Sequence, residues 1–276
     1  MQQFSLPKQS FLHQLAGFTI SKRQRFVISV FCLSLGLFFS ETYRQFHLYV
    51  SFLLSLITVL ALFWSNFKDI KENHSPMIYV LPFFFTLSFG LFYFLLGDRI
   101  LSRIVLTTLY AIGLYSLFLS QNIFIVSSIR TIALLSSARL VSTVLVLITF
   151  VFLTATIFSL RLFLFPTAII VFVYSFFLIS HVFWIYTLEN SFFPNREWTV
   201  FLSLCIFEVT LTLWFWPAHF AFIAVFLMGF LYTLVSLSHL WFEKKLFKGS
   251  LWEYLWISIV IFIILLFFTF ILPLGY

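Results

Sequence analysis

The sequence has little charge. Of its 276 residues only 9% are Asp, Glu, Lys or Arg, whereas a typical soluble domain has about 25%. Hydrophobic residues make up 62% of the chain. A water-facing surface cannot be assembled from so few charged groups, but a chain surrounded by lipid needs very few. The composition therefore excludes a soluble globular protein and indicates an integral membrane protein.

Residues that commonly carry chemistry are also scarce. The chain has 9 Asp plus Glu and 2 Cys, and Asp69 and Asp98 fall in different connections between apolar runs. Metal-dependent transfer enzymes need clustered acids, and Cys32 and Cys205 lack the spacing of a zinc or disulfide site. Motifs for nucleotide binding, serine hydrolysis and zinc proteolysis are absent. We therefore expect no cofactor and no metal, and a non-enzymatic role is favoured over an enzymatic one.

Long apolar runs are what the chain does contain. Most reach the ~17 to 25 residues that a spanning helix needs, although the first has only 15. We expect an all-α polytopic bundle, with a cytoplasmic tail at 1–25 that includes an amphipathic surface helix and a single transmembrane domain at 26–276. The nine expected spans are 26–40, 48–64, 77–96, 104–119, 140–160, 162–186, 198–215, 218–241 and 251–272.

The basic residues predict the orientation of these spans. If all nine cross the membrane, twelve of the 16 Lys and Arg fall on one side and four on the other. Loops on the cytoplasmic side carry the excess of basic residues. Without the first span the division becomes eight against eight, so nine spans with the N-terminus in the cytoplasm and the C-terminus outside are preferred.

The positive charges occur singly or in short clusters between apolar runs, which is typical of membrane orientation and not of nucleic-acid binding. The segment 125–139 is amphipathic, and we expect it to lie on the membrane surface like the tail helix. A docking surface for a soluble partner is the alternative. The residues expected to contact anionic lipid headgroups are Lys22, Arg23, Arg25, Arg130, Arg139, Lys244, Lys245 and Lys248.

Glu208 is the one acid predicted within the membrane. It lies ten residues into an 18-residue span, where an ionisable group costs on the order of 2.5 to 3.5 kcal/mol. Cys205 and Thr212, at i−3 and i+4, form a polar stripe with it that we expect to face other helices. His181, in the preceding span, is the nearest candidate partner in depth.

Two interpretations of Glu208 remain open. With His181 it could form a protonatable pair in a proton-coupled carrier, or it could be protonated and hydrogen-bonded across the bundle as a structural contact. With only 8 Gly in the chain, the interrupted helices of many transporters are not evident, which weighs against the carrier.

Several segments resemble an uncharacterised family of bacterial multi-pass membrane proteins. They include Glu208, 213–217 (Leu-Trp-Phe-Trp-Pro), 229–232 (Gly-Phe-Leu-Tyr), 242–248, 252–255, and 129–135 with Ala138 and Arg139. The resemblance covers mainly the second half of the chain. It implies the cytoplasmic membrane of a bacterium and no assigned activity.

Three functions are compatible with these observations. The leading hypothesis is a scaffold or subunit of a membrane complex, whose partners are anionic lipid headgroups and another membrane protein. The alternatives are a small-molecule or ion carrier that uses Glu208, and a lipid-modifying enzyme. The enzyme requires an interfacial cluster of acids or histidines that the sequence does not reveal.

Overall fold

The computed structural model describes residues 21–40, 46–70, 75–95, 100–127, 134–188, 193 and 195–271. The expected tail helix and Arg130 lie outside these residues. Within them the chain forms nine α-helices and one 3-10 helix, with no strand. These are α2 (Lys22–Phe39), α3 (His47–Ile70), η2 (Pro76–Tyr79), α4 (Val80–Tyr93), α5 (Ile100–Ser127), α6 (Leu135–Ser159), α7 (Leu164–Thr187), α8 (Arg196–Trp214), α9 (Phe220–Phe242) and α10 (Lys248–Ile271).

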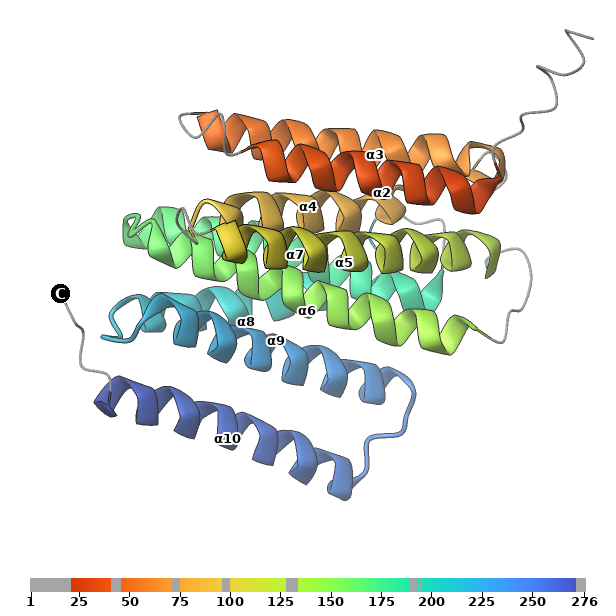
Figure 1. Ribbon diagram of the computed structural model, residues 1–276. Coiled ribbons are helices and arrows are strands. Elements are labelled where there is room, and N and C mark those ends of the chain that lie inside the picture. The colour runs from red at the N-terminus through yellow and green to blue at the C-terminus, as the bar shows by residue number, and fades with distance from the viewer. Residues whose placement is uncertain are drawn as a thin grey trace, which may run out of the picture.

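The all-α expectation is confirmed, and the described helices include eight that are long and apolar enough to cross a membrane. Helix α2 is not among the eight, because its first turn contains Lys22, Arg23 and Arg25. The helices run roughly side by side, with α2 and α3 at one edge of the bundle and α10 at the opposite edge (Figure 1). Helix α10 packs on α9, and α8 packs on α7 and α9.

Contacts between helix ends define a basic end of the bundle. Lys22, at the start of α2, donates to Asn122 near the end of α5. The guanidinium of Arg25 lies 5.6 Å from the ring of Trp64 near the end of α3. Successive helices are therefore antiparallel here, as membrane-spanning helices joined by short connections must be. The basic residues with described side chains at this end are Lys22, Arg23, Arg25, Arg139, Arg196, Lys244, Lys245 and Lys248.

Two expected helix boundaries are wrong. Helix α5 continues past the predicted end at residue 119 to Ser127, because the polar residues that follow find partners inside the bundle. Ser120 donates to the Ser116 carbonyl, and Gln121 is fully buried. The expected surface helix at 125–139 is also divided, since its two ends belong to α5 and α6.

Helices α3 and α4 approach each other closely at Gly90. A Cβ added there would lie 2.8 Å from the Ser51 hydroxyl oxygen and 2.9 Å from the Ser51 Cβ. The hydroxyl could rotate away, but the Ser51 Cβ can retreat only if the backbone of α3 moves. Glycine is therefore required at this contact for steric reasons.

We predict that Gly90→Ala destabilises the protein. Overpacking a tight contact costs about 1 to 3 kcal/mol, more than the roughly 1 kcal/mol that alanine gains over glycine within a helix. The melting temperature in mild detergent should fall by several degrees. Gly249→Ala is the matched control, because no described atom lies within 4 Å of its added Cβ. An unchanged melting temperature for Gly90→Ala would show that α3 and α4 separate without cost.

Candidate functional site

Glu208 lies on the exposed face of α8. Thr212 is also exposed on this helix, and Cys205 is half-buried. The neighbouring exposed residues Phe201 and Phe215 continue the same stripe along the helix. We call this stripe, made of Phe201, Cys205, Glu208, Thr212 and Phe215, the α8 outer face. The expectation that Glu208 faces other helices of its own chain is therefore wrong.

The reason lies in a second polar stripe on the same helix. Helix α8 buries Thr199, Ser203 and Thr210, whose hydroxyls donate to the carbonyls four residues earlier at 3.2, 2.7 and 2.7 Å. Hydroxyl groups that bond to their own helix can be buried without a partner from elsewhere. A carboxyl group cannot satisfy itself in this way, so the hydroxyl stripe lies on the buried face of α8, a helix that packs on α7 and α9.

His181 is fully buried and bonded to three other parts of the chain. Its Nδ1 lies 3.0 Å from the Met77 carbonyl, which can only accept, so Nδ1 carries the proton. Its Nε2 then accepts from Ser142 Oγ at 3.3 Å and from Gln121 Nε2 at 3.5 Å. We call this group the His181 cluster. It ties together η2, α5, α6 and α7.

Glu208 and His181 do not form the pair that the sequence suggested. No hydrogen bond or ion pair joins them within the described residues, and both ring nitrogens of His181 are occupied by the His181 cluster. Their depths also differ by about 9 Å at 1.5 Å per residue, because His181 lies six residues before the end of α7 and Glu208 twelve after the start of α8.

The basic end holds a cluster that sequence analysis did not assemble. The Arg139 guanidinium donates to the carbonyls of Ile185 and Tyr186 at 2.9 and 3.2 Å, and it lies 5.2 Å from the Tyr186 ring. The Tyr186 ring lies 3.7 Å from the His239 ring. Of these residues, the sequence indicated only Arg139 as a candidate. It did not indicate the partners of Arg139, because they lie 46 residues or more away along the chain.

Glu243 completes this cluster at the end of α9. Lys245 Nζ donates to Glu243 Oε2 at 2.9 Å, and His239 Nε2 lies 3.4 Å from Glu243 Oε1. The hydrogen bond from Lys245, with a further contribution from the charge of His239, holds the pKa of Glu243 below its ordinary value. The carboxylate is therefore ionised at neutral pH. We call Arg139, Tyr186, His239, Glu243 and Lys245 the basic-end cluster.

The other described residues expected at lipid headgroups lie near the same end of the bundle. Arg23, Lys244 and Lys248 are exposed, while Lys22 and Arg25 are half-buried against α5 and α3. Lys22 and Arg25 therefore contact the bundle through their charged groups, while the other three extend from its surface.

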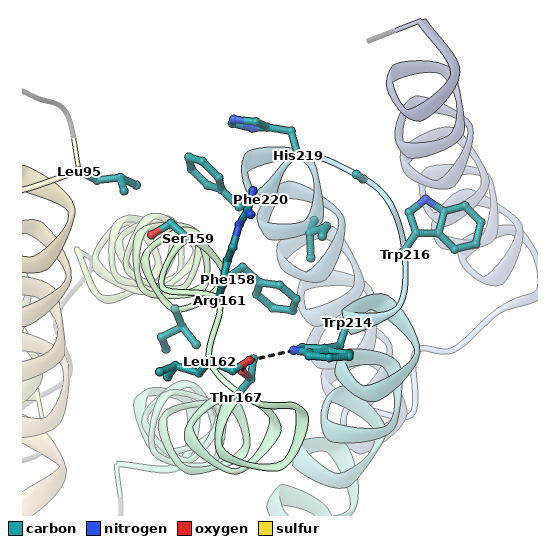
Figure 2. A pocket seen from close by; sticks show the side chains of 13 residues that line it. Leu95, Phe158, Ser159, Arg161, Leu162, Thr167, Trp214, Trp216, His219 and Phe220 are labelled. Atoms are coloured by element: carbon teal, nitrogen blue, oxygen red, sulfur yellow. Dashed lines mark hydrogen bonds between the residues drawn. The ribbon is translucent and has the colours of Figure 1, made fainter. Parts of the chain in front are cut away.

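The opposite end of the bundle contains an open pocket of about 480 Å³, shown in Figure 2. It lies between the α6–α7 and α8–α9 turns, and its described lining includes Arg161 and His219 but no acid. Trp214 Nε1 donates to the Leu162 carbonyl at 3.1 Å, as the dashed line in Figure 2 shows. Trp216 Nε1 donates to Thr269 Oγ1 at 3.1 Å. The two tryptophans thus fasten the end of α8 to the α6–α7 turn and the α8–α9 turn to α10.

Among the described residues, no group of three His, Cys, Asp or Glu side chains lies close enough together to hold a metal ion. The candidate sites instead lie in separate places: the pocket at the opposite end, the α8 outer face, the His181 cluster and the basic-end cluster. The last of these can bind an anion, since it presents an arginine and a lysine beside one carboxylate.

The apolar helices and their arrangement define a multi-pass membrane protein. A family model described as a protein of unknown function (DUF5656) matches residues 35–268, and the chain belongs to this family. The match extends well beyond the second half of the chain, where the sequence motifs lie. No curated protein and no solved structure matches the chain.

We predict that His181→Leu destabilises the bundle. The substitution leaves the Met77 carbonyl and the polar groups of Gln121 and Ser142 without this partner, and each such buried group costs about 1 to 3 kcal/mol. The melting temperature in detergent should fall markedly.

Ser180→Ala is the matched control for this prediction. Ser180 precedes His181 on α7 and is equally buried, but its hydroxyl has no partner among the described residues. Its replacement should leave the melting temperature unchanged or slightly raised. Equal effects of the two substitutions would show that the His181 cluster contributes only packing.

Proposed function

We propose that the chain is a subunit of a membrane complex and that the α8 outer face binds a transmembrane helix of another polypeptide. The observation that carries this proposal is the exposure of Glu208 near the middle of an apolar helix. A membrane helix with such a residue towards lipid is unfavourable by on the order of 2.5 to 3.5 kcal/mol. A partner helix that offers a hydrogen-bonding group at this depth removes most of that cost.

The shape of the α8 outer face supports the same proposal. Cys205 and Thr212 are small, and they flank Glu208 along the helix axis at spacings of three and four residues. Small residues allow the backbones of two membrane helices to approach closely, and an interhelical hydrogen bond then forms at short range. Phe201 and Phe215 at the two ends supply apolar contact area.

The distribution of charge supports nine spans with the N-terminus in the cytoplasm. Helix α2 packs along α3 and α5, and its 18 residues measure about 27 Å, close to the ~30 Å of the hydrocarbon core. Its three basic residues then lie at the headgroups. Among the described side chains, Arg103 and Arg161 are the only lysines or arginines at the opposite end. Because basic residues are in excess on the cytoplasmic side, the basic end faces the cytoplasm. The family resemblance supports the cytoplasmic membrane of a bacterium.

The position of Glu208 supports the subunit in preference to the carrier. A coupling carboxylate must be reached by water or substrate through the protein, and none of the described cavities is lined by Glu208. The lipid-modifying enzyme is not favoured by any described group of acids.

We predict that Glu208→Leu weakens a complex that the wild-type chain forms in membranes. Loss of one interhelical polar contact, worth about 0.6 to 1.7 kcal/mol, lowers the association constant by about threefold to eighteenfold. Glu208→Gln keeps a hydrogen-bonding group and should retain the complex. Glu197→Leu is the control, since it removes an exposed acid from the first turn of the same helix. Native gel migration of mild-detergent extracts measures the change.

The partner can then be identified from Cys205. In a Cys32→Ser background Cys205 is the only cysteine, and oxidation in membranes would link two copies of the chain if the complex is a homodimer through α8. If no such link forms, a photo-crosslinker at Thr212 would capture a different protein, and this capture should be lost in Glu208→Leu. Wild-type protein that is monomeric in its own membrane, or a complex unaffected by Glu208→Leu, would contradict the proposal.

A further inference from the structure

A cleft of about 630 Å³ opens in the side of the bundle at the basic end. Its walls come from α6, α7, α9 and α10. On α6 the residues Arg139, Thr143 and Leu147 follow one another at intervals of four and line the cleft along the helix axis. They span about 12 Å at 1.5 Å per residue. The cleft is therefore elongated in the direction in which lipid chains run.

The polarity of the lining changes along this direction. The end nearest the membrane surface holds Arg139, Tyr186, His239 and Glu243, all members of the basic-end cluster. The deeper part continues into a smaller, mostly apolar cavity. The residues that line both are Thr143, Leu147, Val182, Tyr232, Val235 and Ser236. Such a lining matches a molecule with a polar head and an apolar chain.

The polar end carries unused positive charge. Arg139 has five N–H donors, and its two hydrogen bonds within the described residues go to the carbonyls of Ile185 and Tyr186. These bonds hold the guanidinium in place, and its remaining N–H groups are available to a ligand. Lys245 does not itself line the cleft, but it is exposed and bonded to Glu243, which does. With one carboxylate against two cations the cluster has a net positive charge, which favours an anionic head.

The cleft is accessible from the bilayer. Leu140 and Val144 line it from α6 and are 68% and 46% exposed, so they lie at a lateral opening towards lipid. On the far side it is bounded by Tyr254 of α10, a helix that packs on α9. A molecule that already resides in the membrane can enter sideways, without crossing the headgroup layer.

We propose that this cleft binds one anionic phospholipid, with its phosphate at Arg139 and Lys245 and one acyl chain between α6 and α9. The guanidinium donates to the phosphate oxygens, which is a strong, charge-assisted interaction. The chain lies against Leu147, Val182 and Val235. This inference is independent of the proposed partner at α8, because no residue of α8 lines the cleft.

The test counts lipids bound to the full-length protein. Purified protein in mild detergent is mixed with equal amounts of phosphatidylglycerol and phosphatidylcholine, and native mass spectrometry measures which lipid is retained. The wild-type chain should retain one phosphatidylglycerol in clear preference to phosphatidylcholine. Arg139→Gln should lower this retention at least tenfold, and Lys245→Gln severalfold.

Two further variants separate this site from general charge attraction. Lys248→Gln removes the same charge as Lys245→Gln at the same end of the bundle. Lys248, unlike Lys245, makes no hydrogen bond or ion pair with Glu243 within the described residues, so retention should be unchanged. Ser236→Phe fills the apolar part and should lower lipid retention with Arg139 intact. Because Arg139 also holds the end of α7, the melting temperature of each variant is measured, and Lys245→Gln and Ser236→Phe carry the test if Arg139→Gln is unstable.

Three results would overturn the proposal. The first is equal retention of the two lipids by the wild-type chain. The second is an equal loss of lipid in Lys245→Gln and Lys248→Gln, which would indicate a diffuse surface charge. The third is that glycerol 3-phosphate binds as tightly as the lipid and that Ser236→Phe does not change this binding. The cluster would then bind a soluble anion, and the apolar part of the cleft would hold no acyl chain.

Discussion

The absence of water within a membrane bundle is the constraint on which this structure depends. A buried polar group in such a bundle is costly unless it finds its partner in the protein itself. His181 meets this requirement with one carbonyl and two side chains from three other helical elements, so its ring fixes the relative positions of four elements at once. The same solution recurs where Thr86 bonds to both Thr58 and Tyr110 across α3, α4 and α5, and where Thr154 bonds to Tyr174 across α6 and α7. These bonds specify which helices pack together, while aromatic side chains fill the volume between them.

A large exposed apolar surface indicates a binding site in a soluble protein, but in this membrane protein it does not. Helix α10 is mostly exposed, yet it is held to its neighbours by specific contacts: Ser258 donates to Thr233 at 3.2 Å, and the rings of Phe222 and Phe268 stack at 4.2 Å. Because lipid solvates the remaining faces of α10 at no cost, exposed leucine and phenylalanine carry no information about binding. In a lipid environment, an exposed or half-buried polar group is the feature that indicates binding. Glu208 and Arg139 are such groups.

The sequence predicts much of the fold and less of the site. Apolar runs and the positions of basic residues predict the helices and their antiparallel order, since both depend on local composition and on the membrane itself. They misplace the end of α5, because Gln121 is buried there and finds a partner in His181, 60 residues away. They also misjudge which face of α8 is buried. On a helical projection Thr210 and Glu208 count equally as polar, but only the threonine can satisfy itself by bonding to its own helix. The contact of Arg139 with Tyr186 joins two helices. A single sequence does not show which side chains form such contacts.

The two surfaces singled out lie on different helices, and this separation has a functional consequence. The α8 outer face belongs to a helix that packs on α7 and α9, whereas the lateral opening of the cleft is formed by Leu140 and Val144 of α6. A polypeptide bound at α8 therefore leaves the cleft open to lipid. Both features still share α9, which contacts α8 along one side and contributes His239 and Ser236 to the cleft on another. Helix α7 also packs on α8 and contributes Val182 and Tyr186 to the cleft. A shift of α7 or α9 on partner binding would change the width of the cleft, so coupling between a partner and a bound lipid can pass through either helix.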